Sequence, residues 1–334
     1  MEKPTILITM GDPSGVGPEI ILKALKKEYI HEICRPVIVG STFVMKQASK
    51  DFSMDFNFKV YDPENKTNSR KTIEIIESGK PIHAFSYSSP SLETGENVFS
   101  YIKDSIELCM KKKAQAIATA PISKTTLKNS NINFQGHTEI LAHYSNTAEY
   151  AMMMYGKDLC VILVTIHIAL KDVPLSITTE KIFNKIVLSD ISLKQRFGIK
   201  NPRIAVCGLN PHAGEDSLFG DEEEKIIIPA VKKAQKIGIN VSDPLPPDTL
   251  FFQAKNKKFD CVLSMYHDQG LIPFKLLHFE DGVNTTLGLP FPRTSVDHGT
   301  AYDIAGKNIA NPKSMIEAIK LAAVQAANMK NFLQ

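Results

Sequence analysis

The chain has 334 residues, of which 43% are hydrophobic and 22% charged, a composition typical of a folded protein with one large or two medium domains. Its formal net charge is only +3 and its basic residues are scattered, which argues against a nucleic-acid partner. The longest apolar run, residues 159–170, is too short to cross a bilayer, and no apolar signal core precedes the first predicted strand. Because the five cysteines lack C-x-x-C spacing, we expect reduced thiols and a cytoplasmic protein without membrane attachment.

Predicted strands and helices alternate along the chain. The β-rich runs lie, in chain order, at residues 6–10, 36–40, 116–120, 160–170, 203–210 and 261–266. Helices are expected at residues 18–28, 98–109, 182–197 and 312–332 from their apolar periodicity and end signals. This alternation predicts an α/β fold with a mostly parallel sheet, in which ligands bind at the carboxyl ends of the strands.

A glycine-rich turn follows the first predicted strand. Gly11, Asp12 and Gly15 precede a helix with Pro18 at its first position, so free backbone N–H groups and the helix dipole face the turn. The spacing is neither G-x-G-x-x-G nor that of a P-loop. The turn is interpreted as an approach point for an anion or a cofactor, with a plain tight turn as the alternative.

Three histidines share one context. His167, His212 and His267 each lie at or just beyond the end of a β-rich run. Three neutral imidazoles can hold a catalytic divalent metal and leave coordination positions open for substrate. Taken singly, each histidine fits a hydrogen-bonded structural role better, so the metal-site prediction depends on their joint placement.

A second set of residues suits an anionic ligand. His137 and Thr138 stand at a probable helix start, where they could bind a phosphate or carboxylate or merely cap the helix. Lys275, Asn284 and Arg293 could together neutralise a phosphate and fix a carboxylate, although scattered surface charges are the alternative.

The run SVDHGTAYDIAGKNIANP, residues 295–312, has two polar glycine loops with few large side chains, which invite close approach by a ligand. It resembles the stretch that forms the adenosine side of the nicotinamide cofactor site in isopropylmalate and isocitrate dehydrogenases. Longer motifs in the same order resemble the 4-hydroxythreonine-4-phosphate dehydrogenase family over nearly the whole chain. They are MGDPSGVGPE, ATAPISK, GHTE, GLNPHAGE, PPDTLF, MYHDQG and GVNTTLGLPFPRTSVDHGTAYDIAGK.

The resemblance implies an isopropylmalate-dehydrogenase-like fold of two α/β/α domains with an active-site cleft between them. The cofactor-side domain is expected at residues 1–125 plus 276–334, and the metal and dimer side at 126–275. The resemblance also implies a homodimer whose metal site is shared across the interface.

Site residues follow from the same resemblance. One divalent metal (Zn, Co, Mg or Mn) is assigned to the three histidines, and NAD, with NADP possible, is the expected cofactor. Which side chain removes the hydroxyl proton stays open between Asp248 and Asp268. The substrate contacts are His137, Thr138, Lys275, Asn284 and Arg293, and the cofactor contacts are Gly11, Asp12, Gly15, Asp297, His298, Gly299 and Asp303.

The implied reaction is NAD-dependent oxidation of 4-phosphooxy-L-threonine and decarboxylation to 3-amino-2-oxopropyl phosphate, in pyridoxal 5'-phosphate synthesis. Dehydrogenases of 4-phosphothreonate or 4-phosphoerythronate, and a dihydrodiol dehydrogenase branch, share most of these motifs. A metal-dependent phospho-ligand binding protein without catalysis is the non-enzyme alternative. The three histidines together with Lys275 and Arg293 favour an enzyme.

Overall fold

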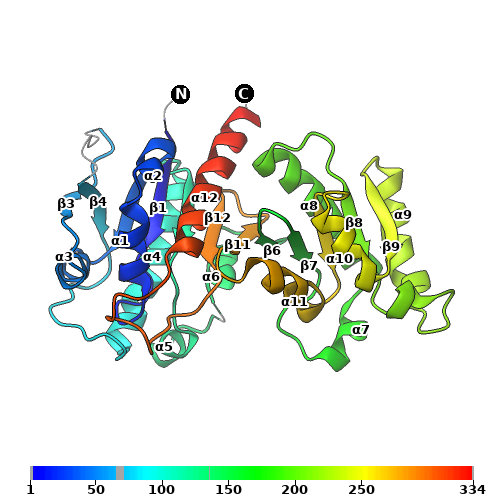
Figure 1. Ribbon diagram of the computed structural model, residues 1–334, viewed down its shortest axis with the longest axis horizontal. Coiled ribbons are helices and arrows are strands. Elements are labelled where there is room, and N and C mark those ends of the chain that lie inside the picture. Colours follow the sequence, from blue (N-terminus) through cyan, green and yellow to red (C-terminus); the bar gives the residue numbers. More distant parts are fainter. Residues whose placement is uncertain (1–2, 65–70, 135, 333–334) are drawn as a thin grey trace. The chain divides into compact units, whose positions relative to one another are not determined.

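The structure is a computed structural model that describes residues 3–64, 71–134 and 136–332 (Figure 1). The chain forms two compact units. Unit 1 comprises Met1–Ala148 and Leu289–Asn331, and unit 2 comprises Glu149–Gly288 and Phe332–Gln334. Among the described residues, no helix is long and apolar enough to cross a membrane.

Unit 1 contains a six-stranded sheet in which every neighbouring pair is parallel. The strand order is β3-β4-β2-β1-β5-β12. The strands are β1 (Thr5–Thr9), β2 (Arg35–Gly40), β3 (Asn57–Val60), β4 (Thr72–Glu77), β5 (Ala116–Thr119) and β12 (Arg293–Val296).

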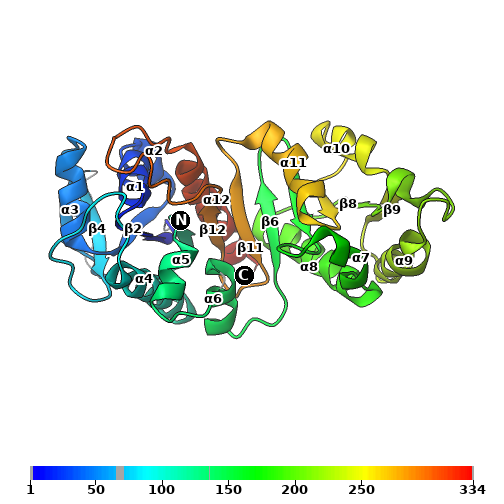
Figure 2. The same cartoon turned by 90° about the horizontal axis from the view of Figure 1, so that it is seen from below.

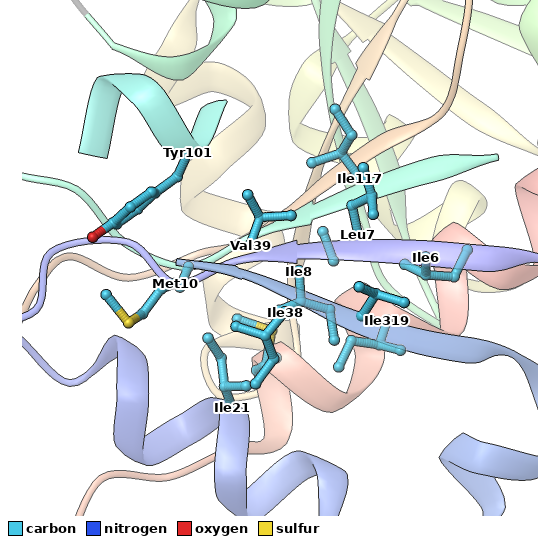
Figure 3. Close-up of a cluster of buried hydrophobic side chains, with 14 of the residues drawn as sticks. Ile6, Leu7, Ile8, Met10, Ile21, Ile38, Val39, Tyr101, Ile117 and Ile319 are labelled. Atoms are coloured by element: carbon cyan, nitrogen blue, oxygen red, sulfur yellow. The ribbon is translucent and has the colours of Figure 1, made fainter. Parts of the chain in front are cut away.

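Helices cover both faces of this sheet. They are α1 (Gly17–Leu25), α2 (Glu28–Ile33), α3 (Thr42–Asp51), α4 (Leu92–Met110), α5 (Lys124–Asn129), α6 (His137–Tyr144) and α12 (Lys313–Phe332). Figure 3 shows Ile21 of α1 and Ile319 of α12 on one face of β1 with Ile8, and Tyr101 of α4 on the other face with Leu7. Because successive strand residues point to opposite faces and both faces are buried, β1 is buried along its whole length and its three central residues are apolar.

Unit 2 contains a mixed six-stranded sheet of order β11-β6-β7-β10-β8-β9. The neighbours β7, β10, β8 and β9 are parallel, whereas β6 runs antiparallel to both β7 and β11. The strands are β6 (Ala151–Tyr155), β7 (Cys160–Leu163), β8 (Ile204–Cys207), β9 (Val241–Leu245), β10 (Cys261–Ser264) and β11 (Val283–Leu287). The α-helices are α7 (Val173–Ser176), α8 (Thr179–Phe197), α9 (Ile228–Lys236), α10 (Pro247–Lys255) and α11 (His267–His278).

The boundaries between the two units lie after Ala148 and after Gly288, further along the chain than the expected boundaries at 125/126 and 275/276. Helices α5 and α6 pack against α4, which keeps them in unit 1, and Figure 2 shows the three helices side by side. Helix α11 packs on β7 and β10, and β11 pairs with β6, which keeps both in unit 2.

The predicted α/β class is confirmed, but single elements differ from the prediction. The expected strand at 160–170 ends at Leu163, because the chain turns through bends into a 3-10 helix at Leu170–Asp172. The expected helix at 98–109 begins earlier, at Leu92, where Ser91 and Thr94 form a capping box. The helix expected at 182–197 likewise begins at Thr179, after the side-chain cap of Thr178.

Candidate functional site

The loops after β1 and β5 meet where the strand order of the unit 1 sheet reverses, which is where parallel sheets bind ligands. The backbone N–H of Asp12 donates to the carbonyl oxygen of Pro121 at 3.0 Å. A Cβ at Gly11 would lie 2.4 Å from the same oxygen, and the Gly11 φ of +71° also favours glycine. The glycine therefore permits the close approach of the two strand ends.

The Asp12 carboxylate is fully buried inside this turn. Its Oδ1 accepts the backbone N–H of Ser14 at 2.9 Å, and its Oδ2 accepts the hydroxyl of Tyr302 at 2.7 Å. Burial raises the pKa of Asp12, and the hydrogen bonds from Tyr302 and Ser14 oppose that rise. Asp12 therefore connects the turn to the loop near residue 302, and both of its oxygens are already engaged.

The glycine-rich turn also contacts the loop at residues 297–303 through backbone atoms. The N–H of Val16 donates to the carbonyl oxygen of Thr300 at 3.0 Å, and a Cβ at Gly15 would lie 2.9 Å from that oxygen. Among the described residues, no atom lies within 4 Å of the position that a Cβ would take at Gly299. The structure thus brings both predicted cofactor segments together within unit 1.

The remaining predicted cofactor residues lie on the same loop. His298 and Asp303 are exposed, and the His298 Nδ1 lies 2.9 Å from the carbonyl oxygen of Gly299. The backbone N–H of Asp297 donates to the Ser314 hydroxyl at 3.0 Å, which fixes the loop to the start of α12. The exposed side chains and the anchored backbone are what a nucleotide-binding loop needs.

A buried guanidinium lies at the start of β12. Arg293 is 2% exposed, and its Nη2 donates to the Thr119 hydroxyl at 2.7 Å. Burial lowers the pKa of Arg293 to about 9, and the charge of Glu139 opposes the shift, so the side chain is cationic at neutral pH. A buried cation beside a helix start suits an anionic ligand.

His137 is the first residue of α6, and Gly136 before it provides no side-chain cap. Burial, followed by the positive charge of Arg293, lowers the pKa of His137 well below its usual value. Its Nε2 is buried and has no hydrogen-bond partner among the residues that the structure describes. Because a buried polar atom normally has a partner, this nitrogen marks a place for a ligand atom, next to the half-buried Thr138.

Two of the three predicted metal ligands lie together in unit 2. The ring centroids of His167 and His267 are 5.8 Å apart. His267 is the first residue of α11, and its Nδ1 lies 2.7 Å from Oδ1 of Asp268. An Nδ1–H donor fits this distance and leaves Nε2 as the nitrogen that could bind a metal. The imidazole pair fits a transition metal.

The third predicted ligand, His212, is exposed on an unusual turn. Six consecutive residues, 212–217, have positive φ, and His212 itself has φ +53°. Such backbone costs about 1–2 kcal/mol per non-glycine residue and concentrates at functional sites. Within residues 3–64, 71–134 and 136–332, no three His, Cys, Asp or Glu side chains are arranged to hold a metal. In the part of the chain that the structure describes, the three predicted ligands therefore form a pair and a separate histidine.

The other predicted residues are also in unit 2. Asp248 is exposed in the first turn of α10, and Asp268 is exposed beside His267. The ammonium of Lys275 on α11 lies 5.5 Å from the ring centroid of Phe279, the residue after that helix. Asn284 on β11 is in register with Met154 of β6.

Two residues that the sequence does not single out, Tyr302 and Glu223, form hydrogen bonds to predicted site segments. Tyr302 lies inside the recognised run 295–312, but its hydroxyl meets a partner 290 residues away. Glu223 stands in the acidic run at 221–224, where nothing in the sequence separates it from surface charge, yet it is 3% exposed. Buried partners of this kind become visible only in three dimensions.

Comparisons with known proteins agree on one family. The model of the family "Pyridoxal phosphate biosynthetic protein PdxA" matches residues 32–322. A 4-hydroxythreonine-4-phosphate dehydrogenase of Desulforapulum autotrophicum is 51% identical over 326 residues, which cover 97% of this chain and 96% of that protein. A D-threonate 4-phosphate dehydrogenase of Cupriavidus necator is 43% identical over 322 residues, 96% of each chain. The crystal structure of 4-hydroxythreonine-4-phosphate dehydrogenase from Klebsiella pneumoniae is 40% identical, has a TM-score of 0.89 and covers 97% of this chain and 100% of that one.

Proposed function

Because this chain belongs to the family of the pyridoxal phosphate biosynthetic protein PdxA, we propose that it oxidises 4-phosphooxy-L-threonine with NAD and decarboxylates the product to 3-amino-2-oxopropyl phosphate. The structural observation that carries the proposal is the pair formed by the half-buried His137, whose Nε2 is buried, and the buried Arg293. One contributes a nitrogen without a partner in the described region and the other a buried positive charge, as an anionic substrate requires.

The cofactor is proposed to lie along residues 297–303, with its nicotinamide towards Gly11 and Gly15; NADP is the alternative. The exposed His298 and Asp303 and the open space at Gly299 support this placement. Asp12 is proposed to act by shaping the turn, because both of its carboxylate oxygens are engaged inside the protein.

A divalent metal is proposed to bind His167, His212 and His267, with Zn or Co favoured over Mg or Mn because the donors are imidazoles. When bound, the metal supplies Lewis acidity at the substrate hydroxyl and the later β-keto oxygen, and NAD accepts the hydride. Asp268 orients the His267 ring through the 2.7 Å contact. Asp248, exposed and without that contact, is then the better candidate of the two for removing the hydroxyl proton.

A second copy of the chain is proposed to complete the metal site. Three large apolar side chains on α11 and at its C-cap are exposed at helical spacing, namely Ile272 (67%), Leu276 (85%) and Phe279 (76%). Exposed apolar patches of this kind mark protein interfaces. Because the same helix begins at His267 and carries Lys275, a copy that docks on it would reach the metal site.

4-Phosphothreonate and 4-phosphoerythronate remain as alternative substrates, since one relative is named a D-threonate 4-phosphate dehydrogenase. We also expect a cytoplasmic protein, in keeping with five cysteines that form no disulfides. Steady-state NADH formation from each of the three phosphorylated hydroxy acids tests the proposal. NADH formation from phosphothreonate alone would overturn the proposed substrate. If no metal-loaded assay gave NADH, the proposal that the protein is an enzyme would be overturned.

A further inference from the structure

We propose that Glu223 is the positioning residue for His212, because its buried carboxylate holds the left-handed turn that presents this imidazole. The inference rests on the proposed function, in which His212 is a metal ligand. It adds a residue of the acidic run at 221–224, which has no role in the reaction as proposed above.

The backbone before His212 is fixed by one carboxylate oxygen. Oε1 of Glu223 accepts the N–H of Leu209 at 2.6 Å and the N–H of Asn210 at 2.8 Å. These two residues follow β8 and immediately precede the segment Pro211–Gly214 that contains His212. The direction in which the chain leaves β8 therefore depends on Glu223.

The second carboxylate oxygen fixes a side chain of the same segment. Oε2 of Glu223 accepts Nδ2 of Asn210 at 2.9 Å, and the same nitrogen donates to Glu222 at 2.7 Å. The carbonyl oxygen of Asn210 in turn accepts the N–H of Ala213 at 3.1 Å. Asn210 thus links the buried carboxylate to the turn on both sides of His212.

Two glycines make room for the carboxylate within the turn. A Cβ at Gly208 would lie 3.1 Å from Glu223 Oε1, and a Cβ at Gly214 would lie 2.9 Å from Oε2. The turn therefore wraps closely around Glu223 from both ends. Glu223 also opens a π-helical turn, Glu223–Ile227, a local irregularity that often occurs at functional sites.

A purely structural role for Glu223 does not account for the unusual backbone of the stretch that contains His212. Ala213, Glu215, Asp216 and Ser217 all have positive φ along with His212, and such conformations persist only where surrounding contacts over-determine them. Glu223 supplies such contacts directly before this stretch, at the N–H groups of Leu209 and Asn210, and the His212 imidazole is among the exposed side chains of the turn. The arrangement fits the presentation of a ligand at a defined position.

The test measures the affinity for Zn²⁺ alone, by competition with a chromophoric chelator, on full-length protein stripped of metal. We expect Glu223→Ala to weaken Zn²⁺ binding roughly tenfold or more, the range found when partners of metal ligands are removed. Glu223→Gln should weaken it less, because its amide oxygen can still accept both backbone N–H groups while its Nε2 opposes Asn210 Nδ2. Asp190→Asn is the matched control, since Asp190 is a buried acid of unit 2 that binds Lys194 on α8 instead.

Thermal unfolding of each variant separates positioning from loss of stability. The proposal requires Zn²⁺ affinity to fall in the Glu223 variants while Asp190→Asn, even if equally destabilised, binds as the wild type does. It is overturned if Glu223→Gln binds Zn²⁺ normally while His212→Ala binds weakly, or if Asp190→Asn loses as much affinity. If His212→Ala binds Zn²⁺ normally, the proposed ligand itself is wrong, and this inference fails with it. If Glu223→Ala does not fold, Glu223→Gln decides.

Discussion

Tyr302 donates its hydroxyl hydrogen to Oδ2 of Asp12 at 2.7 Å, across 290 residues of sequence. The bond joins the glycine-rich turn to the loop at residues 297–303. Both segments are proposed to bind NAD, so the bond should set their spacing before the cofactor arrives.

Tyr302→Phe should therefore weaken NAD binding, measured by isothermal titration. We expect a loss of about tenfold, because a hydrogen bond to a charged acceptor contributes about 1.5–3 kcal/mol. The variant also loses one of the two donors that oppose the raised pKa of Asp12, so this pKa should rise further. As the pH is lowered, the NAD affinity of the variant should therefore start to decline at a higher pH than that of the wild type. Tyr61→Phe, which removes a hydroxyl that contacts the Lys113 carbonyl elsewhere in unit 1, is the control. Equal NAD affinity in both variants would remove the role given to Tyr302.

The half-buried His137 should make the protein sensitive to acid. Because its pKa in the folded state is well below 6.5, the unfolded chain takes up a proton near pH 6.5 while the folded one stays neutral. The free energy of unfolding should thus fall as the pH drops below about 6.5, and this histidine should contribute no slope above that pH.

Urea denaturation at a series of pH values checks this expectation. Between about pH 6.5 and 5, His137→Gln should lose less stability than the wild type, because it has no imidazole to protonate. His83→Gln, at an exposed position in the same unit, should retain the wild-type slope. Parallel slopes for all three proteins would contradict the lowered pKa.

The sequence predicts the α/β class and the ends of several strands, because buried parallel strands are short apolar runs followed by turn residues. It misses β6, whose sequence AMMMY has weak strand propensity and is held by antiparallel pairing with β7 and β11. The run at 160–170 is mostly apolar, but its strand comprises only Cys160–Leu163. In both cases the extent of the strand depends on which strands pair with it, and this pairing is set by the tertiary structure.

The candidate site divides in the same way. Motif position alone predicts Gly11, Gly15 and Arg293, since their predicted roles follow from backbone freedom or charge. It does not identify Glu223, because its burial and its three hydrogen bonds to Leu209 and Asn210 come from local chain folding that leaves no periodic signal in the sequence. 

The exposed stripe on α11 predicts a dimer that one charge should disrupt. Leu276→Glu should raise the dimer dissociation constant by more than about tenfold, because losing one buried leucine alone costs about 1.5–3 kcal/mol. Light scattering across a dilution series measures the change. Val60→Glu, on an exposed residue of β3, should leave assembly intact. If the wild type is monomeric at every concentration, a metal site shared between copies is excluded.

Arg293→Ala should weaken binding of phosphorylated substrate more than binding of NAD. The buried guanidinium and His137 are proposed to bind the substrate anion, and a lost charge-assisted hydrogen bond costs about 1.5–3 kcal/mol, equivalent to roughly 10- to 150-fold in affinity. Arg293→Lys retains the charge but lacks the planar fork, so it should fall between the alanine variant and the wild type. Arg203→Ala, at a surface ion pair with Asp260 in unit 2, should change neither affinity.

Titration of 4-phosphooxy-threonine and NAD into each variant separates the effects. An equal loss for both ligands would mean that Arg293 maintains unit 1 as a whole, and a loss for NAD alone would move the cofactor, not the substrate, to this cation.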